Sequence, residues 1–218
     1  KKWILRFDPR DTFENFLRRE GTAPLPPYIK RTAGNGLRDR DLERYQTVYA
    51  RTPGSIAAPT AGLHFTEKTF LNLREKGVRT ISLTLHVGLG TFQPVEVEEV
   101  EDHRMEGEFF EMNREAADII RTAQRVTTVG TTSTRVIETV FHDGGEAAPL
   151  KGTTNLFIYP GFDFRRVDRL ITNFHLPRSS LFLLVCAFAG RDLMLEAYKK
   201  AVTEGLRFYS YGDAMLIL

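Results

Sequence analysis

Short hydrophobic runs with strand spacing alternate along the chain with longer stretches of helical spacing. The clearest strand pattern is VRTISLTLHV at 78–87, where apolar side chains face one way and Thr, Ser and His face the other, as in a half-buried strand. Further strands are predicted at 107–112, 126–130, 156–162 and 168–174, and a loop at 142–155. Because helices fill the other intervals, the pattern predicts an α/β fold, with a sheet of mixed direction covered by helices on both faces.

The helices are predicted from apolar residues that recur every three or four positions and from residues that begin or end a helix. Thr66 and Asn113 are suited to cap helices that start after them, and Gly77 is suited to the position just past a helix end. We expect helices at 11–21 and 41–50, after Thr66, after Asn113 and after Gly130, at 181–189, and before Gly205. The side chains expected to face inward are Phe70, Leu71, Leu73, Ala116, Ala117, Ile120, Ala123, Val136, Ile137, Val140, Phe141, Leu193, Ala197, Tyr198, Ala201 and Val202.

The first residues predict a domain boundary close to the start of the chain. KKWILRF at 1–7 has the composition of a strand, yet no initiator Met and no turn precede it, so we expect the chain to begin inside a domain whose earlier part is absent. Three prolines between Pro24 and Pro27 impose extended backbone and end the preceding helix. We therefore expect the exit of one domain at 1–21 and a second, α/β domain at 22–218.

Length and composition indicate an ordinary globular protein. The chain has 218 residues, of which 42% are hydrophobic, enough for one large domain or two small ones. The one cysteine, Cys186, lies in the apolar run LFLLVCAFA, which indicates a reducing compartment and a buried, unreactive thiol. That run is far shorter than the ~20 residues that cross a membrane, and no basic-then-apolar leader opens the chain. We expect a soluble, cytoplasmic protein.

The net charge of +2 is small but unevenly distributed. Residues 1–51 carry 12 Lys and Arg against 7 Asp and Glu, whereas residues 96–118 carry 2 against 10. The basic residues around a Gly-rich loop of the first segment are Lys30, Arg31, Arg38 and Arg40. This distribution fits a polyanionic partner on one side of the molecule, and it also fits a solvated surface with no partner.

Three loops place a histidine beside Gly, Pro or hydroxyl residues. They are GSIAAPTAGLHF at 54–65 with His64, HVGLGTF at 86–92 with His86, and NFHLPRSS at 173–180 with His175. Loops of small residues let the backbone approach a ligand, and histidine side chains titrate near neutral pH. His86 also ends the strand at 78–87, where ligands bind in open α/β sheets, and a surface histidine is the alternative. The GLG of the second loop is not a dinucleotide motif, because no helix follows it.

A fourth candidate is the helix start that follows VTTVG, where Gly130 precedes a cluster of hydroxyl residues. The cluster TTSTR runs from Thr131 to Arg135. A strand, a glycine and a helix start with free N–H groups form a cradle for an anion or polar ligand. The alternative is that the hydroxyl groups only cap the helix. The sequence has no CxxC metal spacing, P-loop or GxSxG motif.

Eight motifs, in order along the chain, resemble the S-adenosylmethionine:tRNA ribosyltransferase-isomerase family of queuosine biosynthesis. They are PLPPYIK, ERYQTVYA, GSIAAPTAGLHF, LHVGLGTF, VGTTSTRVIET, LFIYPGF, LITNFHLPRSSL and FYSYGDAMLIL, spread from Pro24 to Leu218. The resemblance implies a three-layer αβα domain joined to a small β-barrel. The family's amino-terminal segments and most of the barrel are missing from this sequence, so KKWILRF is expected to be the last strand of that barrel.

The resemblance also implies a reaction and its substrates. S-adenosylmethionine acts as a ribosyl donor and not as a methyl donor. Its ribose is moved and isomerised onto the 7-aminomethyl group of a 7-deazaguanine base in the tRNA anticodon loop. The product is epoxyqueuosine, and adenine and methionine are released. No metal is expected, and the protein is expected to be a monomer.

The first step of such a reaction removes the C5′ proton beside the sulfonium, which requires a base with a pKa near the working pH. His64, His86 and His175 are the three candidates, and the sequence does not choose between them. Hydrogen-bond donors would stabilise the charge that develops as adenine leaves. The hydroxyl groups expected to do so are those of Thr131, Thr132 and Ser133.

The remaining expected contacts bind the two substrates. Arg135 and Arg178 are candidates for the methionine carboxylate or a tRNA phosphate, with structural salt bridges as the alternative. Tyr159 and Phe174 are candidates to stack on the target base. The tRNA backbone would be bound by Lys30, Arg31, Arg38 and Arg40. The complete set of expected substrate-binding residues is Pro59, Thr60, Gly62, Gly88, Gly90, Thr91, Gly130, Thr131, Thr132, Ser133, Arg135, Tyr159, Asn173, Phe174 and Arg178.

Two other functions are compatible with parts of the sequence. An S-adenosylmethionine-dependent tRNA methyltransferase would use the same co-substrate but give a methylated product and keep adenosine intact. A non-catalytic RNA-binding module would explain the basic first segment and the aromatic residues. It would leave the three loop histidines without a role.

Overall fold

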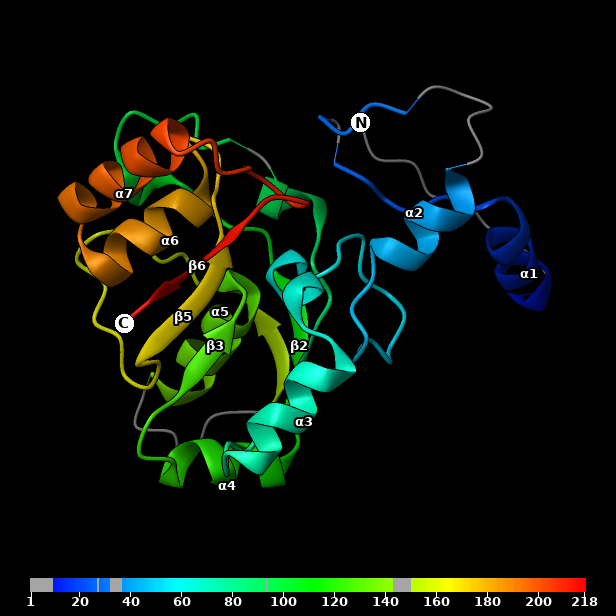
Figure 1. Cartoon of the computed structure of the whole chain (residues 1–218), viewed down its shortest axis with the longest axis horizontal. Helices are drawn as coiled ribbons and strands as arrows, with labels where there is room; N and C mark the ends of the chain where they lie inside the picture. The colour runs from blue at the N-terminus through cyan, green and yellow to red at the C-terminus, as the bar shows by residue number, and fades with distance from the viewer. Residues whose placement is uncertain (1–9, 27, 32–36, 93, 143–149) are drawn as a thin grey trace. The chain divides into compact units, whose positions relative to one another are not determined.

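The computed structural model describes residues 10–26, 28–31, 37–92, 94–142 and 150–218. The chain divides into two compact units between Tyr45 and Gln46. The boundary predicted near residue 22 was inferred from the prolines between Pro24 and Pro27 and from a barrel strand at 1–7, which lies outside the described residues, and it stays a prediction. Figure 1 shows the elements of each unit.

In the first unit, the described residues form two short helices, α1 (Arg10–Glu20) and α2 (Arg38–Arg44). The helix predicted at 11–21 is confirmed. The helix predicted at 41–50 is wrong in its bounds, because α2 begins earlier and ends at Arg44. Residues 51–58 are irregular, as expected for a segment rich in Pro and Gly.

Among its described residues, the second unit has two sheets of three strands each in place of the single sheet expected. One is antiparallel throughout, in the order β1 (Thr84–Leu85), β2 (Glu108–Glu111) and β4 (Lys151–Thr154). The other has the order β3 (Thr127–Val129), β5 (Arg169–Asn173) and β6 (Ala214–Ile217), with β3 and β5 parallel and β6 antiparallel to β5. The predicted mixed α/β class is therefore confirmed.

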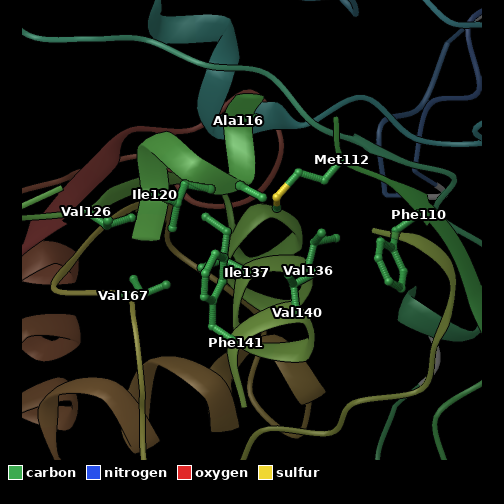
Figure 2. Close-up of a cluster of buried hydrophobic side chains, with 11 residues drawn as sticks. Phe110, Met112, Ala116, Ile120, Val126, Val136, Ile137, Val140, Phe141 and Val167 are labelled. Carbon is green, nitrogen blue, oxygen red and sulfur yellow. The ribbon is translucent and has the colours of Figure 1, made fainter. Parts of the chain in front are cut away.

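Helix α5 (Thr131–Phe141) contacts strands of both sheets and forms the centre of the second unit. Its stripe of apolar side chains packs against α4 (Arg114–Thr122) and β2, as Figure 2 shows. Asn113 begins α4 as predicted, because its side-chain oxygen accepts the Ala116 N–H at 2.7 Å. The predicted inward residues that are buried in this cluster are Ala116, Ala117, Ile120, Val136, Ile137, Val140 and Phe141.

A second cluster lies where α6 (Ser180–Ala189) and α7 (Arg191–Thr203) pack beside β5 and β6. Cys186 is buried there, and burial raises the pKa of its thiol, in agreement with an unreactive cysteine. Leu193 and Val202 were predicted to face inward and do not, being 57% and 66% exposed. Ala201 was also predicted to face inward and is buried, and Met194, seven residues before it on the same stripe, is buried as well.

The second unit also contains the short 3-10 helix η1 (Thr60–His64) and α3 (Glu67–Glu75), which precede its sheets in the chain. Thr66 caps α3 as predicted, since it accepts the Thr69 N–H at 3.2 Å, and Gly77 follows the helix with φ +74°. Leu71 was predicted to face inward, but it is 58% exposed, and α3 carries no buried side chain. Two further 3-10 turns are η2 (Leu89–Phe92) and η3 (Val100–Asp102).

Two strand predictions and one loop prediction were wrong in extent or position. Only Thr84 and Leu85 of 78–87 pair with a neighbour, since Val78 and Ile81 are exposed. Residues 156–162 form no strand, although Ile158 is 1% exposed and part of the core. Strand β4 lies in a segment predicted as loop, because Lys151–Thr154 pairs with β2 despite its polar sequence. Tertiary pairing outweighs local propensity in each case. None of the described helices has the length and hydropathy of a membrane span.

Candidate active site

Three loops meet at one edge of the β3-β5-β6 sheet. Because β3 and β5 are parallel, their carboxyl ends lie at the same edge, and the Gly130 N–H donates to the Ile171 carbonyl at 2.8 Å there. Asn173 at the end of β5 pairs with Ala214 at the start of β6. The loops after β3 and β5 and before β6 are therefore neighbours, at the position where open α/β sheets bind ligands.

The 3-10 helix η1 joins this edge through side chains from distant parts of the chain. The Thr60 hydroxyl donates to Asn173 Oδ1 at 2.9 Å across 113 residues of sequence. The Asn173 amide donates to the Gly212 carbonyl at 3.3 Å, and His64 Nε2 lies 3.0 Å from the same carbonyl oxygen. Asn173 is 3% exposed, whereas His64 is exposed. We call Thr60, His64, Asn173 and Gly212 the edge cluster.

The turn that carries Gly212 is tightly held. The Asp213 carboxylate accepts the Arg207 N–H at 2.7 Å and the Arg207 guanidinium at 3.2 Å. These contacts lower the pKa of Asp213, with a smaller contribution from the nearby His64 ring. A Cβ at Gly212 would collide with the backbone of Arg207 and Phe208, so the turn requires glycine. The Gly212 carbonyl is consequently a fixed acceptor.

The stretch 54–65 connects the two sheets. The Val87 N–H donates to the Ser55 hydroxyl at 3.1 Å, and the Ile56 N–H donates to the Val87 carbonyl at 3.3 Å. Its first residues thus lie along the end of β1, whereas Thr60 and His64 lie at the edge of the other sheet. Gly62 is required because a Cβ there would collide with the Tyr49 hydroxyl.

His86 directly follows β1 and lies beside the first residues of the stretch 54–65. Its ring stacks on Phe109 with a centroid distance of 5.5 Å and packs against Gly54, whose φ is +137°. A Cβ at Gly54 would lie 2.8 Å from the imidazole, so the close approach needs glycine. His86 Nδ1 is buried and has no hydrogen-bond partner among the described residues.

His175 is half-buried on the α7 side of β5. Its Nε2 lies 2.8 Å from the Thr172 hydroxyl, and its backbone N–H donates to the Tyr198 hydroxyl at 2.9 Å. Burial lowers the pKa of His175 to about 4, because an imidazolium is poorly solvated there. Within the described ranges, His64, His86 and His175 share no hydrogen-bond or stacking partner.

A buried ion pair between Glu108 and Arg135 supports the loop at 88–91. Glu108 Oε1 accepts the Gly88 N–H at 2.8 Å and the Thr91 hydroxyl at 2.7 Å, while Oε2 is bound by Arg135 Nη1. Arg135 Nε donates to the Leu156 carbonyl at 2.9 Å. Both charged side chains are at most 4% exposed, and Arg135 Nη2 is buried without a partner in the described ranges. Arg135 therefore forms the salt bridge that was the alternative to a ligand contact.

The start of α5 has its own hydrogen bonds. Gly130 begins the helix with φ +90° and provides no side-chain cap. The Ser133 hydroxyl donates to the Val129 carbonyl at 3.0 Å, and the Thr134 and Thr128 hydroxyls lie 2.8 Å apart. These groups satisfy local backbone and side-chain partners. Thr131 and Thr132 are the first two residues of α5 and follow the end of β3 after Gly130.

The other expected substrate contacts lie in varied surroundings. Phe174 is 4% exposed and packs against Tyr198 and Phe208, whereas Tyr159 is half-buried and packs against Phe157. Arg178 is exposed and has φ +57°, an unfavourable region for a residue other than glycine. Its carbonyl accepts the Val95 N–H at 2.8 Å. Pro59 precedes η1, and Gly90 lies against Glu106.

The basic residues of the first unit are partly engaged within that unit. Arg31 binds Asp41 with two hydrogen bonds of 2.7 and 2.9 Å and lowers the pKa of that carboxyl. Arg38 donates to the Gly21 and Arg19 carbonyls at 2.9 and 2.8 Å, which satisfies the end of α1. Lys30 and Arg40 are exposed.

Sequence reasoning missed Glu108 and Gly212 as site residues. Glu108 could have been found from the strand pattern, because it lies two residues before the buried Phe110 and so on the same face of β2. A carboxylate on a buried face needs charged or polar partners. The signal for Gly212 was its place in the motif FYSYGDAMLIL. Among the described residues, no group of three or more His, Cys, Asp or Glu side chains is arranged to hold a metal ion.

The fold and the edge cluster define a mixed α/β protein with a polar site at the carboxyl edge of its parallel strands. A family model described as Queuosine biosynthesis protein matches residues 1–217, and the chain belongs to this family. It is 57% identical over 218 residues to the S-adenosylmethionine:tRNA ribosyltransferase-isomerase of Syntrophus aciditrophicus, covering 100% of this chain and 60% of that protein. The protein of the same name from Clostridium kluyveri is 53% identical, with 98% of this chain and 62% of that protein covered.

A solved structure gives a similar result. The crystal structure of S-adenosylmethionine tRNA ribosyltransferase from Thermotoga maritima matches with a TM-score of 0.60 and 43% identity, covering 72% of this chain and 51% of that one. The chain thus spans about 60% of the length of the curated relatives that it matches.

Proposed function

We propose that this chain carries catalytic machinery of an S-adenosylmethionine:tRNA ribosyltransferase-isomerase. Its membership of the queuosine biosynthesis family supports this function, as do relatives of that name at 57% and 53% identity. The observation that carries the proposal is the edge cluster, in which His64 and Asn173 from distant segments meet at one carbonyl. A structural protein has no need of an exposed histidine held in this way at a ligand-binding edge.

The reaction would use S-adenosylmethionine as a ribosyl donor. A base removes the C5′ proton beside the sulfonium, the ribosyl group is transferred and isomerised onto the 7-aminomethyl-7-deazaguanine of tRNA, and adenine and methionine leave. The product is epoxyqueuosine. His64, His86 and His175 are the three candidate bases, and the amides and hydroxyls at the start of α5 are candidates to stabilise the charge on the leaving group.

The surroundings of each residue refine its proposed role. Thr60 and Asn173 belong to the edge cluster, and Thr131 and Thr132 follow the neighbouring strand. Because the Arg135 guanidinium is bound to Glu108, Arg135 supports the loop at 88–91, and Arg178 is the better candidate for the methionine carboxylate. Tyr159 is the better candidate for stacking on the target base, because Phe174 is buried in an aromatic cluster. Pro59, Gly62, Gly88, Gly90 and Thr91 shape the two loops that would enclose the substrate.

The tRNA carrying the 7-aminomethyl-7-deazaguanine base is the proposed partner. A base in a single-stranded loop is cheaper to extract than one in a duplex. Lys30 and Arg40 are the leading candidates for backbone phosphates, since Arg31 and Arg38 have partners in their own unit. The broader proposal is a cytoplasmic monomer with a three-layer αβα catalytic domain at 22–218 and the last strand and exit of a β-barrel at 1–21, without a metal.

The test is the fate of the co-substrate. The full-length protein, incubated with S-adenosylmethionine and precursor tRNA, should release free adenine and methionine in equal amounts. Chromatography and mass spectrometry of the small molecules and of the digested tRNA would detect both products and the modified base. Formation of S-adenosylhomocysteine without adenine would contradict the proposal and indicate a methyltransferase. Tight tRNA binding with no consumption of S-adenosylmethionine would indicate a binding module.

A further inference from the structure

We infer that His64 is the base, acting through Nδ1, and that the Gly212 carbonyl holds its ring in the tautomer that makes Nδ1 available. This inference rests on the proposed function and deepens it, because the sequence leaves three histidines open. It follows from the hydrogen-bond partners of each ring, from their exposure, and from the chemistry of a carbonyl acceptor.

The tautomer follows from the Gly212 oxygen. A backbone carbonyl can only accept hydrogen bonds, so the 3.0 Å contact requires the proton of neutral His64 to be on Nε2. The other ring nitrogen, Nδ1, is then unprotonated, and it has no hydrogen-bond partner among the described residues. His64 is an exposed residue, in keeping with a ring that meets a substrate.

The position of the carbonyl is fixed from two sides. The Asn173 amide donates to the same oxygen at 3.3 Å, and Thr60 holds the Asn173 side chain through Oδ1 at 2.9 Å. The turn before β6 is held by Asp213 and Arg207. Thr60 and Asn173 are therefore positioning residues that act on His64 through a main-chain atom.

The other two histidines are less suited to accept a proton. Protonating His175 would create a cation in a buried site where the pKa is already lowered to about 4, and its Nε2 faces Thr172. The His86 ring is stacked on Phe109 and pressed against Gly54, with Nδ1 buried. Both residues are less exposed than His64.

The proton-transfer step balances without any further reactant. The C5′–H bond of S-adenosylmethionine breaks, its electron pair stays on the carbon beside the positive sulfur, and a new N–H bond forms at His64 Nδ1. The ring becomes a cation whose Nε2–H bond to Gly212 is strengthened by the charge. Asp213 is the acidic group near this ring, and its carboxylate is itself bound by Arg207. The proton can then pass to the nitrogen of the departing adenine.

The first experiment reads the tautomer directly. Nitrogen-15 NMR of the full-length protein with labelled histidine, assigned with a His64→Gln variant, should show Nε2 protonated and Nδ1 unprotonated in neutral His64. A neutral ring protonated at Nδ1 would overturn the inference, whatever the activity of the protein.

The second experiment measures single-turnover adenine release. His64→Gln retains an N–H donor for the Gly212 carbonyl but has no basic nitrogen, so the rate should fall at least about 100-fold, with the thermal midpoint and the Kd for S-adenosylmethionine unchanged. The control His142→Gln replaces an exposed histidine that stacks on Phe162 and should keep the wild-type rate. A His64→Gln rate within threefold of wild type would overturn the base assignment alone. No adenine release by the wild type would overturn the proposed function and, with it, the catalytic role.

The positioning residues have a separate readout. Thr60→Val removes the hydroxyl that holds Asn173 and should lower kcat about 10-fold with little change in KM, whereas Thr60→Ser should restore kcat. If both variants change KM and leave kcat intact, Thr60 contacts the substrate and does not position His64.

Discussion

At the scale of single residues, the three loop histidines look alike in sequence and differ in surroundings. Each follows or precedes small residues, so composition alone could not rank them. Their differences arise from residues far away in sequence, such as Gly212 for His64 and Tyr198 for His175. Long-range packing therefore gives each imidazole a different environment.

His175 gives a prediction about acid stability. An unfolded histidine takes up its proton near pH 6.5, whereas folded His175 does so near pH 4. The unfolded state binds more protons between these values, so the free energy of unfolding should fall by roughly 3 kcal/mol from this residue as the pH is lowered from about 6.5 to 4. Urea unfolding at several pH values measures this.

The matching variant separates His175 from other titrating groups. His175→Gln cannot be protonated and can still bond to Thr172, so its stability should depend less on pH in this window. His142→Gln, which changes an exposed ring, should keep the wild-type dependence. Equal slopes for wild type and His175→Gln would show that the ring is protonated in the folded protein.

At the scale of elements, Glu108 joins three segments that have little else in common. It links β2 to α5 through Arg135 and to the loop at 88–91 through Gly88 and Thr91. A carboxylate buried with one cation and two further donors is costly to disrupt, because the remaining charge of Arg135 cannot reach water.

We predict that Glu108→Gln will reduce the free energy of unfolding by about 3 kcal/mol. Glu111→Gln is the control, because it lies on the same strand in an exposed pair with Lys151 at 3.3 Å and should cost under about 1 kcal/mol. Denaturant unfolding measures both. Equal losses would mean that the buried ion pair contributes no more than the surface pair.

The double variant Glu108→Leu with Arg135→Met distinguishes stability from positioning. Replacing both charges by apolar side chains should recover most of the lost stability. The loop at 88–91 would still lack the Glu108 carboxylate that accepts its hydrogen bonds. The rate of adenine release should therefore stay below that of the wild type. Recovery of activity together with stability would remove the loop from the proposed site.

Much of the fold at this scale was predictable, and the exceptions have physical causes. The caps at Thr66, Asn113 and Gly77 are local, and their hydrogen bonds or φ angles agree with the sequence. Strand β4 was not predictable from Lys-Gly-Thr-Thr, because β2 selects it by pairing. The edge cluster was predictable in part. Thr60, His64 and Asn173 were expected, but their meeting at Gly212 depends on the path of the chain.

At the scale of the whole molecule, charge is divided between segments. The basic residues of the first unit are of two kinds, those bound within the unit and those exposed. This separates residues that stabilise the unit from residues that are open to the proposed tRNA contact, which the sequence alone could not do.

We predict that the double variant Lys30→Glu with Arg40→Glu will raise the KM for tRNA. The slope of log KM against log salt concentration should become shallower by about 0.7 for each phosphate contact that is lost. Arg38→Glu should instead lower the stability of the first unit, because Arg38 holds the end of α1. Lys199→Glu, an exposed change on α7, is the control. Steady-state kinetics at several salt concentrations measure the slopes, and an unchanged slope for the double variant would remove Lys30 and Arg40 from the tRNA interface.

The Gly212 carbonyl has a consequence for genetics. It belongs to the main chain, so no substitution deletes it, and a scan that replaces each side chain in turn would report His64 and Asn173 as two separate sensitive positions. A substitution at Gly212 would disturb the turn through its Cβ and leave the carbonyl in place, so such data would not identify the carbonyl as the common partner. Only a backbone change, such as replacing the amide after Gly212 by an ester to weaken the acceptor, would reveal the third member of this arrangement.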